Sequence, residues 1–505
     1  MKKKTILFFS RCELVHMYGK LHKYLISDYN IVHVAYSEDE ASVLLNDYGI
    51  SNIWIFKNEF LVEKEEFTLC NTLIKEIDNL FIYQTDGRFN LNGSIQSDRT
   101  FLNLDYHIAL EITAIYHKVW QKIFSSLKID FFIHEPTSLM LNHMAYVLCK
   151  QQGGVYSTHI MVPGEADYNF IMVDNDNGYP TEIINKFNSI TDEDIELNKE
   201  RIKLFLDNFR SSYNVFFDVL GSGKPSLNFY FKIFKSAIKE QLFRFISIKK
   251  IERSIDNVEY FLNNNRLYSK RIKNFIDYRK IKYDEYVSDI DFYFYPLHLE
   301  PEAVVLYWAG SIYSNQVKLI ENIASQLPPC TMLYVKDHPH LYGYRDVSDY
   351  KRIQDIPNVK LLAPHLPGKK IVNDSKGVIT LNGTAGLEAL LLNKQIISFG
   401  SAFYNVSSRV NYVRNIKDFR ILIYDLKGVN YEDDDELKKF VLAYLDSHKV
   451  GFTDFYGNVA NEIELDMMVN IENVAKGLAL FFSKYENFIN LNEQVFDVKK
   501  KINEH

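Results

Sequence analysis

Short apolar segments alternate with amphipathic stretches through about the first 160 residues of the chain. The apolar segments are rich in β-branched and aromatic side chains, as strands are, and they lie at residues 5–10, 30–36, 52–56, 80–83, 130–134 and 155–159. Between them, residues 102–127 repeat isoleucine or valine at spacings of three and four, which is typical of a helix with one buried face. This alternation predicts βαβ units and a parallel sheet covered by helices.

The alternation stops near residue 181, and charged helical patterns with few strand signals continue to residue 284. Apolar runs resume at residues 291–296, 331–335, 359–362, 377–381, 395–400 and 420–424, and helical spacing returns in the tail at 469–481. We therefore expect an α/β chain with an N-terminal Rossmann-like domain (1–180), a helical basic insert or connector (181–285), a second Rossmann-like domain (286–425) and C-terminal helices (426–505). Two such domains leave a cleft between the carboxyl ends of their sheets, where open α/β folds bind ligands.

Length and composition agree with a globular protein of two domains, because 505 residues with 47% hydrophobic side chains can form two separate cores. The net charge of -7 is small and well mixed, which argues against a nucleic-acid partner. No run approaches the roughly 18 to 20 apolar residues of a membrane-spanning helix. The four cysteines lie far apart, without metal-ligand spacing, so we expect a cytoplasmic protein without a metal site.

The net charge hides an asymmetry between the connector and the remainder of the chain. Residues 224–284 contain 15 lysines and arginines against 6 acidic residues, so this segment carries +9 and the remainder -16. Around residues 231–235 and 243–246 aromatic and basic side chains are mixed, as in helices that lie on a membrane surface. Two interpretations stay open: peripheral contact with anionic lipid at the inner face of the cell membrane, or a solvated helix packed on the enzyme.

The densest chemical signal is the segment 333–340, in which an apolar run ends in Lys336, His338 and Pro339. Pro339 prevents the strand from continuing, so the two basic side chains are expected at a turn that faces the cleft. This pair is suited to a phosphate. The competing interpretation is a turn with a solvated lysine.

A second signal is the segment 378–390, where a buried strand runs into a glycine-rich turn and then into a helix that begins near Thr384. A helix start presents free N–H groups to an anion, and Thr380 and Asn382 add side-chain donors. Glu388, one turn into the helix, could accept hydrogen bonds from ribose hydroxyls. We predict a nucleotide site that also includes Gly383, Ala385 and Gly386. Many α/β proteins, however, use such glycines only to enter a helix.

A third signal lies at residues 293–302, the end of the first strand of the second domain. His298 and Glu302 fall where this strand would meet the cleft, so both are candidates for the nucleotide site. A hydrogen-bonded structural histidine explains His298 equally well.

Together these segments resemble a known family. Tyr-Pro-Leu-His-x-x-Pro-Glu at 295–302, Val-Lys-Asp-His-Pro at 335–339, Asn-Gly-Thr-Ala-Gly-Leu-Glu-Ala-Leu at 382–390 and Ile-Ser-Phe-Gly-x-x-Phe-Tyr at 397–404 resemble the bacterial capsular-polysaccharide and surface-carbohydrate glycosyltransferases. The resemblance covers residues 290–405 and is diffuse elsewhere. It implies the GT-B architecture, related to transferases for Kdo and other nonulosonic acids that use CMP-sugars. It also implies that His338 and Pro339 contact the nucleotide phosphate, that residues 382–386 with Glu388 hold phosphate or ribose, and that no metal or other cofactor is required.

The catalytic carboxylate is expected from the first domain. Residues 131–136 form a buried strand that ends in Glu135 and a proline, just before a predicted helix, so Glu135 is our candidate general base. Asp86, after the expected strand at 80–83, and Asp98 are the alternatives. The Asp-x-Asp at 174–176 has no strand context in the sequence, so we assign it no metal.

These observations predict a metal-independent transferase that moves a sugar, such as Kdo or a sialic-acid relative, from a CMP-sugar to a bacterial surface glycan or glycolipid. A CDP-glycerol-type glycerophosphotransferase and a UDP- or GDP-sugar GT-B transferase are the nearest alternatives. A two-Rossmann nucleotide-sugar epimerase and a glycan-binding scaffold are the alternatives outside the transferases.

Overall fold

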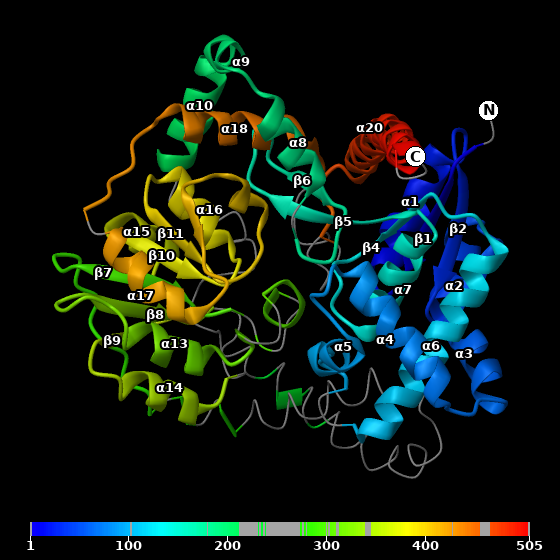
Figure 1. Ribbon diagram of the computed structural model, residues 1–505, viewed down its shortest axis with the longest axis horizontal. Helices are drawn as coiled ribbons and strands as arrows, with labels where there is room; N and C mark the ends of the chain where they lie inside the picture. The colour runs from blue at the N-terminus through cyan, green and yellow to red at the C-terminus, as the bar shows by residue number, and fades with distance from the viewer. Residues whose placement is uncertain are drawn as a thin grey trace.

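The computed structural model describes residues 3–101, 104–178, 180–211, 280–298, 300, 304–309, 313–338, 345–426, 428–454 and 465–502, together with eight single residues between 231 and 278. In the last helix the side chains are described as far as Tyr485. The chain forms two sheets that lie side by side, each covered by helices (Figure 1).

The N-terminal sheet has seven strands in the order β13-β6-β5-β4-β1-β2-β3. Five of them are parallel: β1 (Thr5–Ser10), β2 (Asn30–Ala35), β3 (Ile53–Ile55), β4 (Phe131–His134) and β5 (Val155–Val162). Two antiparallel strands complete the edge, namely β6 (Asn169–Val173) and β13 (Lys449–Val450). The five strands that we expected are thus parallel, and the two further strands at the edge make the sheet mixed.

Alternate residues of β1 point into two different cores, because successive side chains of a strand face opposite sides of the sheet. Leu7 and Phe9 pack with α6 (Tyr106–Ser126) and α7 (Met140–Gln151). Ile6 and Phe8 pack with α1 (Leu14–Leu25) and with α20 (Met467–Ile502). The remaining helices of this domain are α2 (Glu38–Tyr48), α3 (Phe56–Glu65), α4 (Asn71–Gln84) and α5 (Leu91–Ser97).

The C-terminal sheet has six parallel strands in the order β12-β11-β10-β7-β8-β9. They are β7 (Phe292–Pro296), β8 (Met332–Lys336), β9 (Val359–Leu362), β10 (Gly377–Thr380), β11 (Gln395–Ser398) and β12 (Val410–Tyr412). One face is covered by α13 (Gln316–Ala324), α14 (Val347–Gln354) and α17 (Ile416–Asp425). The other face is covered by α15 (Gly368–Asp374), α16 (Thr384–Leu391) and α18 (Asp435–Ser447), on which α8 (Thr181–Ser189), α9 (Asp192–Leu197) and α10 (Lys199–Ser211) pack.

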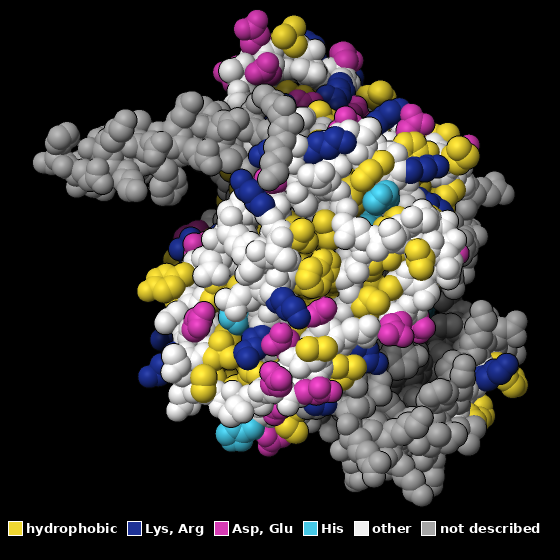
Figure 2. Space-filling view, turned by 90° about the vertical axis from the view of Figure 1, so that its right-hand side faces the viewer, with side chains coloured by type: hydrophobic (Ala, Val, Ile, Leu, Met, Phe, Trp, Pro, Cys, Tyr) yellow, Lys and Arg dark blue, Asp and Glu magenta, His cyan; other side chains and the backbone are white. Residues whose placement is uncertain are grey.

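The chain returns to the N-terminal domain after α18, where β13 pairs with β6 and α20 packs on α1. The C-terminal region thus contains a strand as well as the expected helices. Among the described residues no helix is both long enough and apolar enough to cross a membrane. Figure 2 shows acidic and basic side chains interspersed over one face of the molecule, as the small net charge predicts.

Most expected strands are confirmed, and two are wrong. Residues 80–83 lie in α4, and residues 420–424 lie in α17. In α17 the buried side chains are Phe419 and Ile423, four positions apart, while Ile421 is 68% exposed, which is a helical and not an alternating pattern. Helices α8–α10 confirm the helical character of the connector over residues 181–211, and most of 212–285 lies outside the described residues.

Candidate functional site

The segments that follow β4 and β7 contact each other at the seam between the two domains. After β7 the chain forms the π-helical turn η3 (Val304–Trp308), whose Tyr307 ring packs edge-on against His143, with 5.1 Å between ring centroids. His143 lies in the first turn of α7, the helix that follows β4 and Glu135. The helix after β4 and the turn after β7 thus pack together where the two domains lie side by side (Figure 1).

His298 follows β7 and reaches the turn after β10. Its Nε2 lies 3.0 Å from Thr380 Oγ1 and accepts the N–H of Leu381 at 3.3 Å. Thr380 Oγ1 itself accepts the N–H of Gly383 at 3.2 Å, so the hydroxyl hydrogen is directed at the imidazole. Burial, reinforced by the charges of Arg345 and His338, lowers the pKa of His298 to about 3. The imidazole is thus neutral, and this network assigns its remaining hydrogen to Nδ1.

Gly383 allows this close approach, because a Cβ at this position would lie 2.7 Å from His298 Cε1. Tyr404 fixes the same turn by donating its hydroxyl to the Gly383 carbonyl at 2.8 Å. The structure therefore brings together three of the predicted residues, His298, Thr380 and Gly383, at one point. The structural interpretation of His298 also holds, since the side chain supports the turn.

Asn382 is the strongest indication that this turn binds a ligand. Its side chain is 8% exposed, and neither its amide nitrogen nor its amide oxygen has a hydrogen-bond partner among the described residues. A buried amide without partners costs stability, so a ligand that pairs with the Asn382 amide would be favoured here. The next residues begin α16 at Thr384, and no side chain caps its first turn. Ala385 and Gly386 continue this helix, as expected.

Lys336 ends β8 as an enclosed cation. Its side chain donates to the carbonyl oxygens of Pro364 at 3.1 Å and Asp337 at 3.4 Å, and it forms no ion pair with a carboxylate in the described part of the chain. Burial lowers the pKa of Lys336 to about 8, against the opposing charges of Asp337 and Glu388. Burial raises the pKa of Glu388 to about 7, against the charges of Lys369 and Lys336. A cation in this setting favours an anionic ligand.

A buried ion network lies beneath these residues, and the sequence did not predict it. Arg345 is 5% exposed, and its guanidinium contacts Glu300 Oε2 at 2.6 Å, Asp337 Oδ2 at 3.1 Å and the His298 carbonyl at 3.0 Å. Tyr350 donates its hydroxyl to Asp337. One side chain thus ties the end of β7 to the end of β8. Nothing in the sequence around residue 345 signals this contact.

Three further residues were predicted for the nucleotide site, and the structure describes one of them. His338 is exposed two positions after β8, and its backbone N–H donates to Asp337 Oδ1 at 2.8 Å. Pro339 and Glu302 lie outside the described residues.

Glu135 emerges after β4 beside the start of α7. Its Oε1 accepts from Arg11 Nη1 at 3.2 Å, from Ser138 Oγ at 3.3 Å and from Asn142 Nδ2 at 3.4 Å. The side chain is 16% exposed. Tyr156 holds the backbone by donating its hydroxyl to the Glu135 carbonyl at 2.8 Å. The carboxylate is thus positioned by Arg11, just after β1, and by Ser138 and Asn142 around the start of α7.

The two alternative carboxylates have other surroundings. Asp98 is buried and accepts from the N–H of Thr100 at 2.6 Å and from the N–H of Met140, so it caps the start of α7. Asp86 follows a helix and not the strand we expected, and its 84%-exposed side chain lies 3.6 Å from Lys150 at the opposite end of α7 from Glu135. Asp98 thus caps a helix, and Asp86 lies at the surface.

The Asp-x-Asp segment follows strand β6, so the expectation of no strand context is wrong. Both carboxylates are nevertheless occupied by protein groups. Asp174 accepts the N–H of Thr181 at 2.9 Å, and Asp176 pairs with Arg88 and with His143 Nε2 at 3.2 Å. In the described part of the chain no group of three or more histidine, cysteine or acidic side chains could hold a metal ion.

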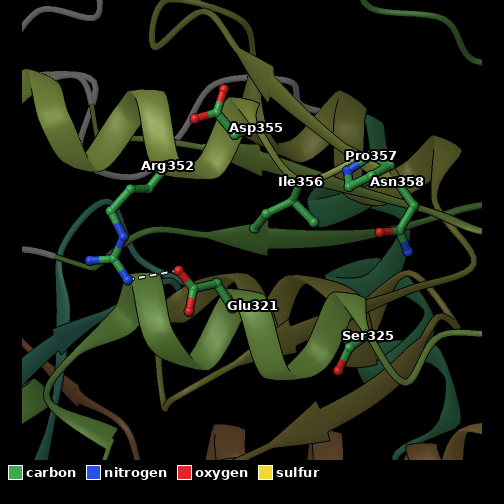
Figure 3. A pocket seen from close by; sticks show the side chains of 7 residues that line it. All are labelled: Glu321, Ser325, Arg352, Asp355, Ile356, Pro357 and Asn358. Atoms are coloured by element: carbon green, nitrogen blue, oxygen red, sulfur yellow. Dashed lines mark hydrogen bonds and ion pairs between the residues drawn. The ribbon is translucent and has the colours of Figure 1, made fainter.

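A surface hollow of about 480 Å³ lies between α13 and α14, away from these residues (Figure 3). Glu321 and Arg352 bridge it with an ion pair at 2.7 Å, and Asn358, just before β9, marks it as lying near the amino ends of the strands. Since ligands of open α/β sheets bind at the carboxyl ends, we place the candidate site at the seam and not at this hollow.

Residues 230–420 match the family model described as capsule polysaccharide biosynthesis protein. Over these residues, the resemblance inferred from the sequence motifs is confirmed. A curated relative, Protein FixF of Sinorhizobium fredii (strain NBRC 101917 / NGR234), is 30% identical over 138 residues. That match spans 27% of this chain and about a third (32%) of the relative.

Solved structures of two kinds are similar to the chain. Thermosulfurimonas dismutans KpsC, a beta Kdo 2,4 transferase, matches at 13% identity with a TM-score of 0.35, covering 69% of this chain and 87% of that one. The UDP-GlcNAc 2-epimerase of Neisseria meningitidis matches at 11% identity with a TM-score of 0.28, covering 95% and 100%. The two-domain architecture itself follows from the strand pairings of this chain.

Proposed function

We propose that this chain, with its capsule polysaccharide biosynthesis segment at residues 230–420, is a metal-independent GT-B glycosyltransferase. In this proposal it transfers a sugar from a CMP-linked donor, such as CMP-Kdo or a related nonulosonic acid, to a bacterial surface glycan or glycolipid. The observation that carries the proposal is the amide of Asn382, which is buried at the uncapped start of α16 and has no hydrogen-bond partner among the described residues.

The C-terminal domain would bind the departing nucleotide. A phosphate at the start of α16 would receive hydrogen bonds from the free N–H groups of the helix and from Asn382. Lys336 would supply positive charge from the end of β8, which is separated from β10 by β7, and the exposed His338 lies two positions further along the chain. Such donors stabilise the negative charge that develops on the leaving phosphate in the transition state. Glu388 would accept from the ribose hydroxyls.

The N-terminal domain would activate the acceptor. An acceptor hydroxyl becomes a good nucleophile when a carboxylate within hydrogen-bond reach takes its proton in the transition state. Glu135 is held for that role by Arg11, Ser138 and Asn142. Each domain thus supplies one half of the reaction, and closure of the seam would bring the halves together.

The basic connector would contact the membrane if the acceptor is a membrane-bound glycolipid. Phe231, Phe234 and Ile238 are 75%, 54% and 47% exposed, and they recur at helical spacings of three and four. These side chains support peripheral contact of residues 224–284 with anionic lipid, on the cytoplasmic side of the membrane.

Thermal unfolding with CMP, CDP, UDP and GDP tests the donor assignment. A ligand that binds the folded state raises the unfolding temperature, so CMP should give the largest shift. Stabilisation by UDP alone would contradict the CMP assignment and favour a UDP-sugar transferase or an epimerase. Preference for CDP would favour a glycerophosphotransferase, and no shift with any nucleotide would favour a glycan-binding scaffold.

The pH dependence of CMP affinity tests Lys336 separately. Because burial lowers the pKa of Lys336 to about 8, the ammonium is present below that pH and is lost above it. We expect the dissociation constant for CMP to rise as the pH increases through 8, measured by titration calorimetry. Lys336→Arg should keep affinity constant over this range, since the guanidinium stays charged. If the dissociation constant of Lys336→Ala for CMP depended on pH as that of the unmodified protein does, Lys336 would not be part of the site.

A further inference from the structure

The junction of α5 with η3 lies where the two domains meet. Helix α5 belongs to the N-terminal domain and contacts η3 of the C-terminal domain, on the side where the domains face each other (Figure 1). Asp98 directly follows α5 and accepts the N–H of Met140 at the start of α7, the helix that comes after Glu135. Residues 97–99 therefore lie beside both η3 and the start of this helix.

The segment after η3 lies close to the turn that carries Asn382. A Cβ at Gly400 would lie 3.0 Å from Ala309 Cα and 2.6 Å from the Leu381 carbonyl oxygen, so the Gly400 backbone packs against both. Ala309 directly follows η3, and Leu381 directly precedes Asn382. The turn η3 thus adjoins elements of both halves of the proposed reaction, namely the helix after Glu135 and the nucleotide turn. The transferred sugar of that reaction would lie between these halves.

Three side chains at this junction have a buried polar atom without a hydrogen-bond partner among the described residues. The atoms are Ser97 Oγ, Arg99 Nε and the Tyr307 hydroxyl oxygen. Ser97 and Tyr307 are 0% and 1% exposed, whereas Arg99 is partly exposed. All three groups can donate a hydrogen bond, and a guanidinium can only donate. Because buried donors without partners cost stability, a ligand with several acceptor atoms would be favoured here.

Arg99 is a guanidinium whose hydrogen-bond donors are unused in the described part of the chain. Its Nε is buried, the side chain as a whole is partly exposed, and it forms no ion pair with a described carboxylate. The neighbouring Asp98 accepts instead from the N–H of Thr100 at 2.6 Å and from that of Met140. Two further arginines near α7 are paired with carboxylates, Arg11 with Glu135 and Arg88 with Asp176. The three carboxylates balance the three guanidiniums in number, so Arg99 offers a ligand unused donors and not an excess of charge.

The Tyr307 hydroxyl lies near this guanidinium. Burial raises the pKa of Tyr307, the charge of Asp98 adds to the rise, and the charge of Arg99 opposes it. A planar guanidinium can bind a carboxylate through two parallel hydrogen bonds, and a neighbouring hydroxyl can add a third. Kdo and its relatives carry a carboxylate bonded to the carbon at which transfer occurs, whereas neutral sugars carry none. A sugar acid would therefore supply acceptors to the donors of this junction.

We propose that Arg99 binds the carboxylate of the transferred sugar, at the junction of α5 with η3, and thereby selects a sugar acid over a neutral sugar. This inference rests on the proposed function, because it assigns the sugar end of the same donor site. Arg99 donates to the carboxylate oxygens from the N-terminal domain, while the nucleotide phosphate is held by the C-terminal domain. A neutral sugar in the same place would leave the guanidinium without an anionic partner.

A ligand-observed NMR titration with free Kdo, run with and without CMP, tests the assignment. The methyl ester of the Kdo carboxyl group is the comparison probe, since it has the same sugar ring without the negative charge. We expect the unmodified protein to bind Kdo at least tenfold more tightly than the ester.

Three variants complete the experiment. Arg99→Met should weaken Kdo binding about tenfold, as expected for the loss of a hydrogen bond to a charged group, and leave the affinity for the ester unchanged. Arg99→Lys keeps the charge but loses the planar fork, so its affinity for Kdo should lie between the other two. Arg352→Met is the matched control, because it removes an arginine on α14 that is 46% exposed and paired with Glu321.

Three results would overturn the proposal. Equal affinity of the unmodified protein for Kdo and its ester would show that the carboxylate is not recognised. Unchanged Kdo affinity in Arg99→Met would place the carboxylate elsewhere. Equal losses for Kdo and for the ester in Arg99→Met would show that Arg99 only maintains the shape of the site.

The thermal shift given by CMP separates this inference from the proposed function. Free Kdo binds without any transfer, so its affinity can be measured whether or not CMP is the donor nucleotide. A CMP shift without binding of Kdo would overturn the role of Arg99 and leave the CMP assignment intact. Binding of Kdo that depends on Arg99, without a CMP shift, would contradict the CMP assignment and support the role of Arg99.

Discussion

Glu135→Gln should lose most sugar transfer while its affinity for CMP stays close to that of the unmodified protein. The amide keeps the shape of the side chain but cannot take the proton of the acceptor hydroxyl. General bases contribute roughly 10²- to 10⁴-fold to rate, and we expect a loss of that order in kcat. The measurements are initial rates of transfer and a calorimetric titration with CMP. His338→Ala should differ by losing CMP affinity as well.

Asp86→Asn provides the matched control for this experiment. It makes the same change from carboxylate to amide in the same domain, at a side chain that is 84% exposed beside Lys150. We expect near-normal transfer from it. Near-normal turnover of Glu135→Gln would show that Glu135 is not the general base. A large loss of turnover in Asp86→Asn with CMP affinity retained would transfer the role to Asp86.

The sequence predicted the strands that are buried on both faces, because such strands are nearly continuous apolar runs. β1 and β9 have the expected limits, and the turn at 380–384 enters a helix at Thr384 as expected. The errors are short apolar runs inside helices. At residues 80–83, Leu80 and Phe81 face the core while Tyr83 is 75% exposed, and four residues are too few to separate a helical from a strand pattern.

Other parts of the site depend on contacts between distant segments, which a local pattern does not contain. Strand β13 has two residues, and it is a strand only because β6 lies beside it. Asp98 resembles a catalytic acid in the sequence, yet it caps a helix that begins 42 positions later. His298 meets Thr380 across 82 positions. Local motifs pointed to candidate side chains for the site. Which of these side chains contact one another depends on the tertiary structure.

Arg345→Met should be the most destabilising single substitution at the donor site. Arg345 compensates two carboxylates, Glu300 at 2.6 Å and Asp337 at 3.1 Å, in a place where the guanidinium is nearly excluded from water. Removing one partner of a buried ion pair leaves an uncompensated charge, and this costs about 3–5 kcal/mol. We expect a loss of that size in the free energy of unfolding, measured by urea denaturation. CMP affinity should fall as well, because His298 and the turn after β8 lose their common support.

Two further variants separate this effect from general loss of charge. Arg352→Met removes an arginine that is 46% exposed and pairs with Glu321 at 2.7 Å, and an exposed pair of this kind contributes only about 0–1 kcal/mol. Arg345→Lys keeps the charge but not the planar fork, so it should recover part of the stability and little of the CMP affinity. If Arg345→Met unfolded at the same urea concentration as Arg352→Met, the network beneath the donor site would have no stabilising role. Equal CMP affinity in Arg345→Met and the unmodified protein would show that His298 keeps its position without Arg345.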